Sequence, residues 1–430
     1  MSEFKTVRGM RDFLPEEAKM MRHIEDTTRK VAELYGFKEI ITPVVESYEL
    51  LSAKSGEEVR SRMFTFKDLG DRQIALRPEF TASVARFVAT TLRNEPQPFR
   101  LFSVGSVYRY DEPQKGRYRE FWQSNYELMG SNRPEADAEI LMLTNSLMEK
   151  AGLKSYAFKV GHVGVLRSIF KQEKLDEKVQ NQAMQLMDKK MYDDASNVIR
   201  EAGASTKCLE ILNQLVKLRG TEIFDIVAKM KECVKDYEQS VSAVESLSEI
   251  LNLVLQSGCM VNMIVDAGFA RGLEYYTGFV FEVYVPDLDI ALGGGGRYDR
   301  LIELFGGEST PAVGVAHGLD RIVLALQEQK AKWTRGPERS VMVIPINEKL
   351  RTEALKFARM LREAGVPTEV EVMGRKVAKA LEDADKRDMD FALIVGEKEL
   401  KDGAVVIKDL KKREQNTVQI EKMLEVIKVQ

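Results

Sequence analysis

The chain is poor in the side chains that most often build metal centres, disulfide frameworks and nucleophile–base pairs. It has only three cysteines and three histidines in 430 residues. The cysteines are odd in number, far apart and without CxxC spacing (Cys208, Cys233, Cys259). The histidines are equally scattered (His23, His162, His317). The sequence therefore argues against a disulfide framework, a cysteine or histidine metal site and a Ser-His-Asp triad.

Long apolar runs and an excess of one charge are also absent. No run approaches the roughly eighteen apolar residues that a membrane helix needs, and the charged start MSEFKTVRGMRDFLPEEAK lacks the apolar core of a secretory signal. Lys plus Arg number 64 against 67 Asp plus Glu, which argues against a protein that coats DNA through bulk charge. An enzyme with its basic residues in one groove stays possible. We expect a cytoplasmic protein of two or three domains with no membrane partner.

The distribution of proline and of apolar residues divides the first 330 residues. No proline stands between Pro134 and Pro286. Within that gap, residues 166–256 repeat apolar residues every three or four positions, which predicts a helical insertion. On both sides of this helical region, aromatic and β-branched runs predict strands over 99–110 and 276–285, and helices are predicted over 16–35 and 316–328. We expect an α+β catalytic domain over 1–330, with an antiparallel sheet and helices on one face.

A separate region follows a polar linker at 331–340. Residues 341–430 contain the apolar runs VMVIPI, PTEVEV, FALIVG and AVVIKD between helical segments. Strands that alternate with helices of this length predict βαβ units and a largely parallel small sheet. The second domain is therefore expected to be α/β.

The most informative segment for chemistry is FRLFSVGSVYRYDEPQKGRYREFWQSNYE (99–127). A predicted strand ends at Arg109, and a charged loop with Asp111, Gln114 and Arg117 precedes a second strand. Guanidinium groups match phosphate oxygens bidentately, so a strand-borne arginine below a basic loop indicates an anion site. A solvated hairpin with surface charges is the alternative reading.

Further segments show unusual combinations of residues. RGLEYYTG (271–278) places Arg271 before two tyrosines, of which only one is expected to face a pocket if the pair opens a strand. ALGGGGRYDRL (291–301) gives room for close approach of a ligand, or is a plain glycine loop. Arg321 lies one turn into a predicted helix and suits a phosphate, although Asp320 and Arg321 also suit an exposed charge pair. Glu79 lies at a strand-to-helix turn, where it also fits simple helix-dipole compensation.

In their order along the chain these segments resemble the class II aminoacyl-tRNA synthetases, and specifically the histidyl-tRNA synthetase family. KEIITPVVE (38–46) resembles motif 1, FRLFSVGSVYRYDEPQKGRYREF (99–121) motif 2 and GVAHGLDRIVLAL (314–326) motif 3. RGLEYYTG and GGGGRYD resemble the two histidine-specific motifs. The resemblance covers almost the whole chain, and it identifies 341–430 with the anticodon-binding α/β domain.

The resemblance implies that the chain activates histidine with ATP and transfers the acyl group to the terminal ribose of histidine tRNA. Arg109 would hold the α-phosphate and the histidine carboxylate, and Arg117 and Arg321 the outer phosphates. Arg271 would neutralise charge at the α-phosphate, and Asp111 would lie near adenine. Positioning and charge stabilisation can supply the rate without a covalent nucleophile, which fits the scarcity of histidine and cysteine.

The family also implies a histidine site, with Arg109 and Arg271 at its phosphate end. Glu79 and Gln123 would lie near the α-amino group, and Glu127 and Tyr276 at the imidazole. The remaining contacts would come from Thr81, Tyr275 and Tyr298. A site built from such hydrogen bonds rejects ligands that cannot make them.

The family resemblance carries three further expectations. Gln114 would approach the acceptor stem of the tRNA. The chain would form a homodimer through the motif 1 strand, and magnesium would accompany ATP without a dedicated protein site. The main alternative is the non-catalytic paralogue that serves as regulatory subunit of ATP phosphoribosyltransferase. Such proteins commonly lose the arginines and the C-terminal domain, both of which this chain has.

Overall fold

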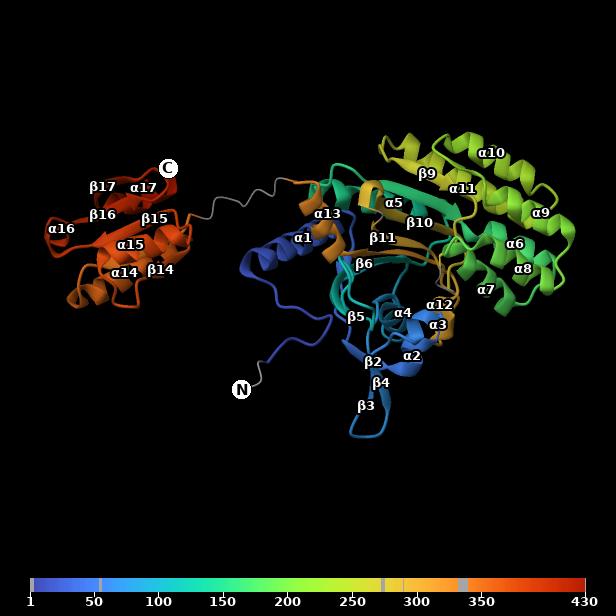
Figure 1. Cartoon of the computed structure of the whole chain (residues 1–430), viewed down its shortest axis with the longest axis horizontal. Helices are drawn as coiled ribbons and strands as arrows, with labels where there is room; N and C mark the ends of the chain where they lie inside the picture. Colours follow the sequence, from blue (N-terminus) through green and yellow to red (C-terminus); the bar gives the residue numbers. More distant parts are fainter. Residues whose placement is uncertain (1–3, 54–55, 272–274, 289, 332–338, 430) are drawn as a thin grey trace. The chain divides into compact units, whose positions relative to one another are not determined.

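The computed structural model describes residues 4–53, 56–271, 275–288, 290–331 and 339–429. It divides into two compact units, Met1–Lys332 and Trp333–Gln430, and each is described by itself (Figure 1). Residues 332–338, most of the expected linker, lie outside the described residues. No helix among the described residues is long and apolar enough to cross a membrane.

A nine-stranded sheet organises the first unit, in the order β1-β5-β6-β12-β11-β10-β7-β9-β8. The six strands from β5 to β7 are antiparallel to their neighbours, whereas β1 and β9 are attached in parallel. The strands are β1 (Lys38–Glu39), β5 (Phe99–Tyr108), β6 (Glu120–Met129), β7 (Ala157–His162), β8 (Arg219–Gly220), β9 (Met263–Asp266), β10 (Phe279–Val285), β11 (Ile290–Arg297) and β12 (Ala312–Gly318). This confirms the predicted α+β class with an antiparallel sheet.

Helices α1 (Pro15–Leu34), α5 (Pro134–Ala151) and α13 (Leu319–Glu328) cover one face of this sheet. Pro15 occupies the first helical turn of α1, and the Glu17 carboxylate accepts from the Leu14 N–H (2.9 Å), so the start of the helix is fixed locally. Alternate residues of β6, such as Tyr126 and Leu128, are buried in the core. The other face of the strands is left for polar side chains.

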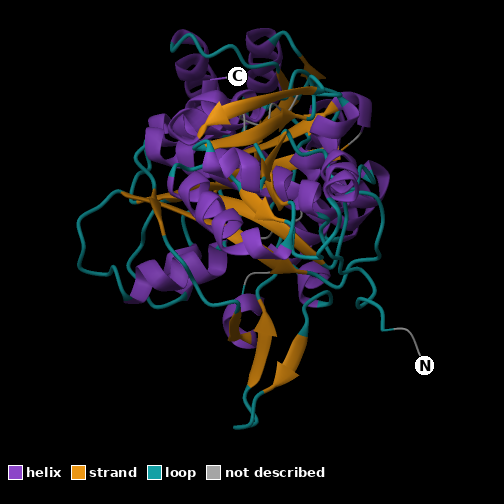
Figure 2. Cartoon of the chain, turned by 90° about the vertical axis from the view of Figure 1, so that its left-hand side faces the viewer, coloured by secondary structure: helices purple, strands orange, loops and turns teal. Residues whose placement is uncertain are grey.

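Smaller elements complete the catalytic unit. A three-stranded sheet, β2 (Val45–Ser47), β4 (Gln73–Leu76) and β3 (Thr65–Lys67), carries a β3–β4 hairpin that projects from the body (Figures 1 and 2). The short helices are α2 (Tyr48–Ser52), α3 (Glu57–Arg60), α4 (Thr81–Thr90) and α12 (Leu301–Leu304). The motif 1 segment is thus two short strands, β1 and β2, on either side of Pro43.

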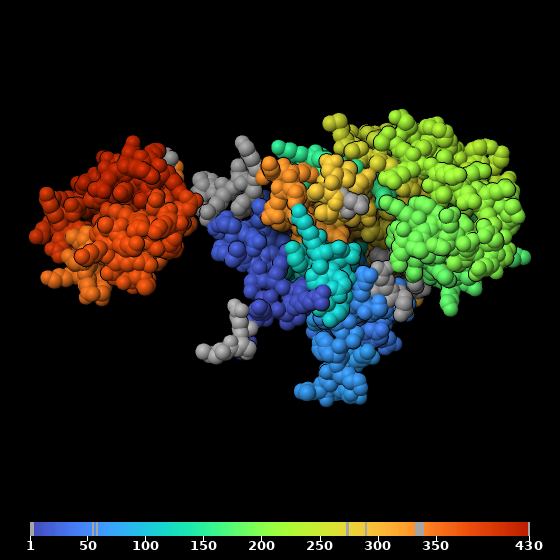
Figure 3. All heavy atoms as spheres, in the orientation of Figure 1, coloured from blue at the N-terminus to red at the C-terminus, as the bar shows by residue number. Residues whose placement is uncertain are grey.

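The helical insertion is present and forms a green to yellow-green lobe (Figure 3). It comprises α6 (Val163–Gln172), α7 (Glu177–Asp188), α8 (Tyr192–Glu201), α9 (Thr206–Leu215), α10 (Ile223–Cys233) and α11 (Glu238–Gln256). The short strand β8 pairs with β9 and ties this lobe to the edge of the main sheet. The insertion is therefore anchored to the catalytic unit by main-chain pairing as well as by its core.

One local prediction is wrong and one alternative reading is excluded. Residues 316–318, predicted as helix, end β12, and residues 293–296 form the middle of β11, which excludes the alternative of a plain glycine loop. A side chain at Gly295 would overlap the carbonyl of Gly314 on the neighbouring strand. The four glycines therefore permit strands to approach closely, which a sequence pattern cannot distinguish from a loop.

The second unit contains a five-stranded sheet in the order β14-β13-β15-β16-β17. Its elements are β13 (Val341–Pro345), α14 (Arg351–Glu363), β14 (Thr368–Val370), α15 (Val377–Lys386), β15 (Phe391–Val395), α16 (Glu397–Lys401), β16 (Ala404–Asp409), β17 (Glu414–Gln419) and α17 (Met423–Val429). The α/β class is confirmed, but only the first three strands are parallel. Strand β17 escaped prediction because it is polar and mostly exposed, without apolar alternation.

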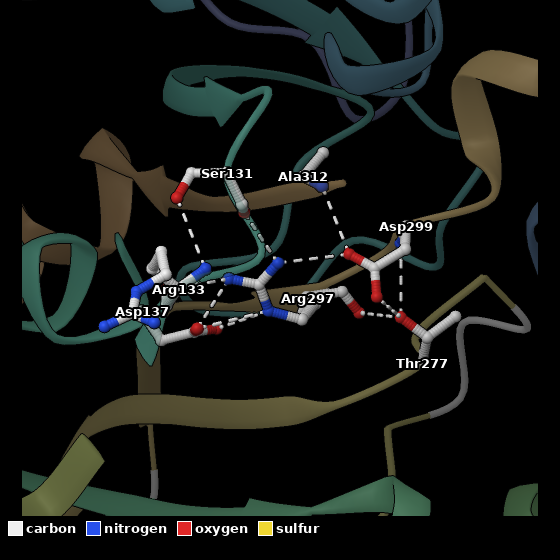
Figure 4. Close-up of polar contacts among 7 residues, drawn as sticks. All are labelled: Ser131, Arg133, Asp137, Thr277, Arg297, Asp299 and Ala312. Carbon is white, nitrogen blue, oxygen red and sulfur yellow. Dashed lines mark hydrogen bonds and ion pairs between the residues drawn. The ribbon is translucent and has the colours of Figure 1, made fainter. Parts of the chain in front are cut away.

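A buried arginine joins the sheet to α5 at the end of β11 (Figure 4). The Arg297 guanidinium donates to both carboxylate oxygens of Asp137 (2.6–3.1 Å) and to the Ser131 carbonyl (2.9 Å). It also donates to Asp299 (3.1 Å), which in turn accepts from Thr277 (3.0 Å). The two residues that flank Tyr298 are thereby fixed.

We predict that Asp137→Ala destabilises the protein by about 3–5 kcal/mol, because it leaves the Arg297 charge buried without its partner. The side chains of this pair are only 2% and 10% exposed. Glu139→Ala on the same helix is the matched control, because its pair with Arg100 is 27% and 34% exposed and is expected to contribute about 1 kcal/mol or less. Urea denaturation measures both losses, and equal losses would contradict the prediction.

Candidate active site

Three polar side chains lie on the uncovered face of β6, at alternate positions. Gln123, Asn125 and Glu127 are all buried, and each has one side-chain oxygen without a hydrogen-bond partner among the described residues. A buried polar atom without a partner is costly, and all three atoms are acceptors. The strand therefore presents a row of acceptors suited to a ligand that carries several N–H donors.

The Glu127 carboxyl lies at one end of this row and is only 1% exposed. Its second oxygen accepts from the Tyr298 hydroxyl. Burial raises the pKa of Glu127 to about 8, while hydrogen bonds from Tyr298, Thr81 and Asn125 act in the opposite direction. Asn125 donates to the Thr81 hydroxyl (3.2 Å), which places the start of α4 beside the strand. Near neutral pH the buried carboxyl is therefore mostly protonated.

Three tyrosines lie next to Glu127. The rings of Tyr275 and Tyr276 are 4.9 Å apart, and that of Tyr275 is 5.6 Å from the ring of Tyr298. The expectation that only one of the adjacent tyrosines faces the site is wrong, because β10 begins only at Phe279 and the pair lies in the preceding turn. Burial raises the pKa of both Tyr275 and Tyr276, and the Glu127 charge raises it further. Residues 272–274 of this motif lie outside the described residues.

Small residues on the neighbouring strands make room for these side chains. The β12 partners of Gln123, Asn125 and Glu127 are Gly318, Ala316 and Gly314. A side chain at Gly314 would overlap the Glu127 carboxylate. We call the residues without larger side chains on this face, Gly294, Gly296, Gly314, Ala316 and Gly318, the small-residue floor.

Arg271 lies over this floor. A side chain at Gly294 would overlap its guanidinium group, which donates to the Phe281 carbonyl (3.1 Å). The Glu282 carboxylate lies 3.7 Å away and the Tyr276 ring centre 5.9 Å away. Burial tends to lower the pKa of Arg271, but Tyr276 and Glu282 raise it above its ordinary value. The Arg271 side chain therefore remains positively charged.

Three more predicted arginines come together from different segments. Arg109 follows β5 and donates to the Pro78 carbonyl (2.9 Å), and Arg321 of α13 donates to the carbonyls of Gly116 (3.3 Å) and Ala291 (2.8 Å). Burial lowers the pKa of Arg321, and neighbouring Arg117 and Arg109 lower it further. Among the described residues, no carboxylate forms an ion pair with Arg109 or Arg321. This arginine group (Arg109, Arg117, Arg271, Arg321) has charge available for an anion.

The loop between β5 and β6 closes as the hairpin that the sequence predicts. Main-chain hydrogen bonds link Gln114 and Arg117 (2.8 and 3.1 Å), and Gln114 is exposed. The Asp111 carboxylate is buried and accepts from Arg62 (3.0 Å), with Arg117 3.7 Å away. Asp111 therefore holds the guanidinium groups of Arg62 and Arg117 at the loop. Sequence reasoning missed these contacts.

Two further residues, Glu79 and His317, lie on opposite faces of the sheet. The Glu79 carboxylate accepts from the N–H groups of Thr81 (2.5 Å) and Ala82 (3.0 Å), so it caps α4 as the simpler reading predicts. His317 faces the helices, with its ring nitrogens 3.2 Å from Ser124 and Thr144, and burial lowers its pKa to about 3. No group of three His, Cys, Asp or Glu among the described residues could hold a metal ion.

Sequence reasoning missed several residues that shape this site. Asn125 stands two residues from both Gln123 and Glu127, so the period of a strand was a usable signal. Gly314, Ala316 and Gly318 show the same period. The contacts of Arg297 with Asp137 carry no local signal, because 160 residues separate the partners.

We predict that the raised pKa of Glu127 makes the protein less stable as pH rises. The folded state keeps a proton that the unfolded chain releases near pH 4.5, so this contribution is complete below that pH and is lost as pH rises through about 8. Glu127→Gln keeps a neutral group and should remove this part of the fall in unfolding free energy. Urea denaturation at about pH 5 and pH 8 measures it, with Glu139→Gln as control. Parallel losses in parent and Glu127→Gln would contradict the assignment.

Comparisons with known proteins agree with this geometry. The histidyl-tRNA synthetase family model matches residues 9–322, and that of an anticodon binding domain matches residues 340–430. The histidine–tRNA ligase of Methanocaldococcus jannaschii is 41% identical over 98% of both chains, and that of Saccharolobus solfataricus is 37% identical over 100% of this chain and 99% of its own.

Solved structures give the same result. The histidyl-tRNA synthetase from Nostoc sp. PCC 7120 superposes with a TM-score of 0.82 at 25% identity over all of both chains. An ATP phosphoribosyltransferase regulatory subunit/histidyl-tRNA synthetase from Bacillus halodurans gives 0.76 at 27% identity, covering 89% of this chain and 97% of its own. Because a family match spans most of the sequence and relatives align with it from end to end, the chain belongs to the histidyl-tRNA synthetase family.

Proposed function

We propose that this site carries out histidine–tRNA ligation, with histidine on the β6 acceptors and ATP on the arginine group. One observation carries the assignment of roles. Buried acceptor oxygens on Gln123, Asn125 and Glu127 have no partners among the described residues, and arginines held by main-chain carbonyls lie beside them. A ligand with an ammonium and an imidazole at one end and anionic groups at the other satisfies both halves.

In the first step a histidine carboxylate oxygen attacks the α-phosphorus of ATP, and the bond to the β-phosphate breaks to release pyrophosphate. Arg109 holds the carboxylate and the α-phosphate together, and Arg271 neutralises the charge that builds on the α-phosphate. Arg117 and Arg321 bind the outer phosphates. Fixed guanidinium groups stabilise developing negative charge without reorganising, and no side chain has to exchange a proton in this step.

Recognition of the amino acid falls to the β6 row. Gln123 and Glu79 receive the α-ammonium group, and Glu127 with Tyr276 and Tyr298 receives the imidazole. Thr81 and Tyr275 hold these groups in place. A carboxyl whose pKa is near 8 can accept from an imidazole N–H or donate to the bare ring nitrogen, so it suits a ring that has both kinds of nitrogen.

In the second step a hydroxyl of the terminal ribose attacks the acyl carbon and AMP leaves. We assign the exposed Gln114 at the loop tip to contact with the acceptor end of the tRNA. In the C-terminal unit, Ile346 follows β13, and Val372 and Met373 follow β14; all three are exposed. The carboxyl ends of parallel strands meet at one edge of a sheet, so these apolar side chains offer a surface on which anticodon bases can stack.

Two further features complete the proposal. Magnesium enters with ATP, whose phosphates supply most of its ligands. A homodimer is supported by apolar exposure along motif 1, where Ile41 is 93% exposed, with Val44 and Val45 also exposed.

Amino-acid-dependent ATP–pyrophosphate exchange tests the first step. We expect exchange with histidine, and none with glycine, threonine or proline. Arg271→Gln should lower the rate by about 10²–10³, whereas Arg200→Gln in the insertion should leave it unchanged. Folded protein without exchange would favour the regulatory subunit of ATP phosphoribosyltransferase. Exchange with another amino acid would overturn the role of Glu127.

A second prediction concerns the small-residue floor. Gly314→Ala should raise the KM for histidine by about 10- to 100-fold, because the new methyl group displaces the Glu127 carboxylate. The KM for ATP should stay within about twofold. The methyl group would also lie 2.7 Å from the Tyr126 carbonyl oxygen, so Glu127→Ala/Gly314→Ala should be less stable than Glu127→Ala, but by less than Gly314→Ala destabilises the parent. Equal changes in both KM values would contradict this role.

A further inference from the structure

The segment before α1 lies against the loop that carries Gln114 and Arg117. We call residues 7–13 the N-terminal arm. The Arg119 N–H donates to the Gly9 carbonyl (2.8 Å). Gly9 has a positive φ of 85°, and a side chain there would lie 2.6 Å from Arg119 Cγ and 3.1 Å from Pro113 Cγ. The arm and the loop are therefore in close contact, and the loop is not a free hairpin.

Arg11 makes the central contacts of the arm. Its guanidinium carbon lies 3.6 Å from the ring centre of Tyr118 in the loop and 4.5 Å from that of Phe13. The same group forms an ion pair with Asp320. A planar guanidinium group can stack on aromatic rings and pair with a carboxylate at the same time, which lysine cannot reproduce.

Asp320 connects this pair to the proposed ATP site. Its side chain is only 2% exposed, and its other oxygen accepts from the Trp122 N–H at the start of β6 (2.6 Å). The next residue is Arg321, which donates to the Gly116 carbonyl of the loop (3.3 Å). The reading of Asp320 and Arg321 as an exposed charge pair is therefore wrong. Arg11 joins the loop, the start of β6 and the start of α13.

The charges of Asp320 and Arg321 explain why the position of Arg11 matters for the proposed ATP site. Without it, a buried carboxylate next to Arg321 would lack its cation and would lower the positive potential of the arginine group. Loss of the stack on Tyr118 would also free the loop that holds Arg117. Both effects weaken the binding of phosphates. Asp320 contacts β6 only at the Trp122 N–H, and in the described part of the chain neither Arg11 nor Asp320 bonds to the side chain of Gln123, Asn125 or Glu127.

We propose that Arg11 is a positioning residue for ATP, which neutralises Asp320 and holds the loop so that Arg117 and Arg321 keep their places. The role rests on the proposed function, because it assumes that these arginines bind the phosphates of ATP. This role predicts different effects on the two substrates. The arm contacts the phosphate side of the site and none of the residues that we assign to histidine.

The test measures KM values for ATP and histidine in the exchange reaction of the full chain. Arg11→Ala should raise the KM for ATP about tenfold or more, and leave the KM for histidine within about twofold. Arg11→Lys, which keeps the charge, should give an intermediate value. Arg8→Ala is the matched control, because Arg8 pairs with Glu112 on the same arm with both side chains more than 70% exposed, and it should change neither value.

Asp320→Asn in the Arg11→Ala background supplies a second readout. Removing the unpaired carboxylate should recover part of the ATP affinity, which a general loss of folding would not do. Equal rises in both KM values, or an unchanged KM for ATP, would overturn the proposal. If Arg11→Ala does not fold, the KM for ATP of Arg11→Lys decides alone: a parental value overturns it. A parent protein without histidine-dependent exchange would instead refute the proposed function.

Discussion

The site depends on the absence of side chains in the middle of an antiparallel sheet. Strands β11 and β12 present glycine and alanine toward the uncovered face, and a methyl group at Gly294 or Gly314 would overlap Arg271 or Glu127. A carboxyl and a guanidinium group can therefore lie flat on the sheet, buried by their neighbours but in reach of a ligand. Catalytic groups on strands are held more rigidly than groups on loops.

Electrostatics then divides the site into two parts. The acceptor row on β6 includes a carboxyl whose pKa burial raises to about 8, and the arginine group lies beside it with carbonyl partners. The two sets do not neutralise one another, because each is held by its own surroundings: Glu127 by Tyr298, and Arg321 by the carbonyls of Gly116 and Ala291. In the proposed function, histidine and ATP bridge them, which would bring the carboxylate and the α-phosphate together.

The sequence predicts most of the architecture and the residues to which we assign substrate contacts. The motifs identify Arg109, Arg271, Arg321 and Glu127, and the structure brings them into one region. Residues that act through sheet register or distant pairing were missed. Gly314 acquires its meaning only when β12 lies beside β6, and the same holds for Arg297 with Asp137 and for Arg11 with Asp320. Those pairings join segments far apart in the chain, where no local period indicates them.

The glycine run at 293–296 also shows that a local sequence pattern is not sufficient to predict secondary structure. Four successive glycines are typical of a loop, but here tertiary packing overrides local preference and makes them a strand. Strand β17 was missed for a related reason, since its polar residues pair with β16 at an exposed edge. Local patterns predict an element well when one of its faces is buried by its own apolar residues.

A crystal structure of the chain with bound histidine tests the central claim most directly. The account predicts an imidazole nitrogen at about 2.7–3.2 Å from the free oxygen of Glu127. The α-ammonium group should lie beside Gln123, with the carboxylate toward Arg109. Histidine bound elsewhere, or bound here with the β6 oxygens still without partners, would contradict the account.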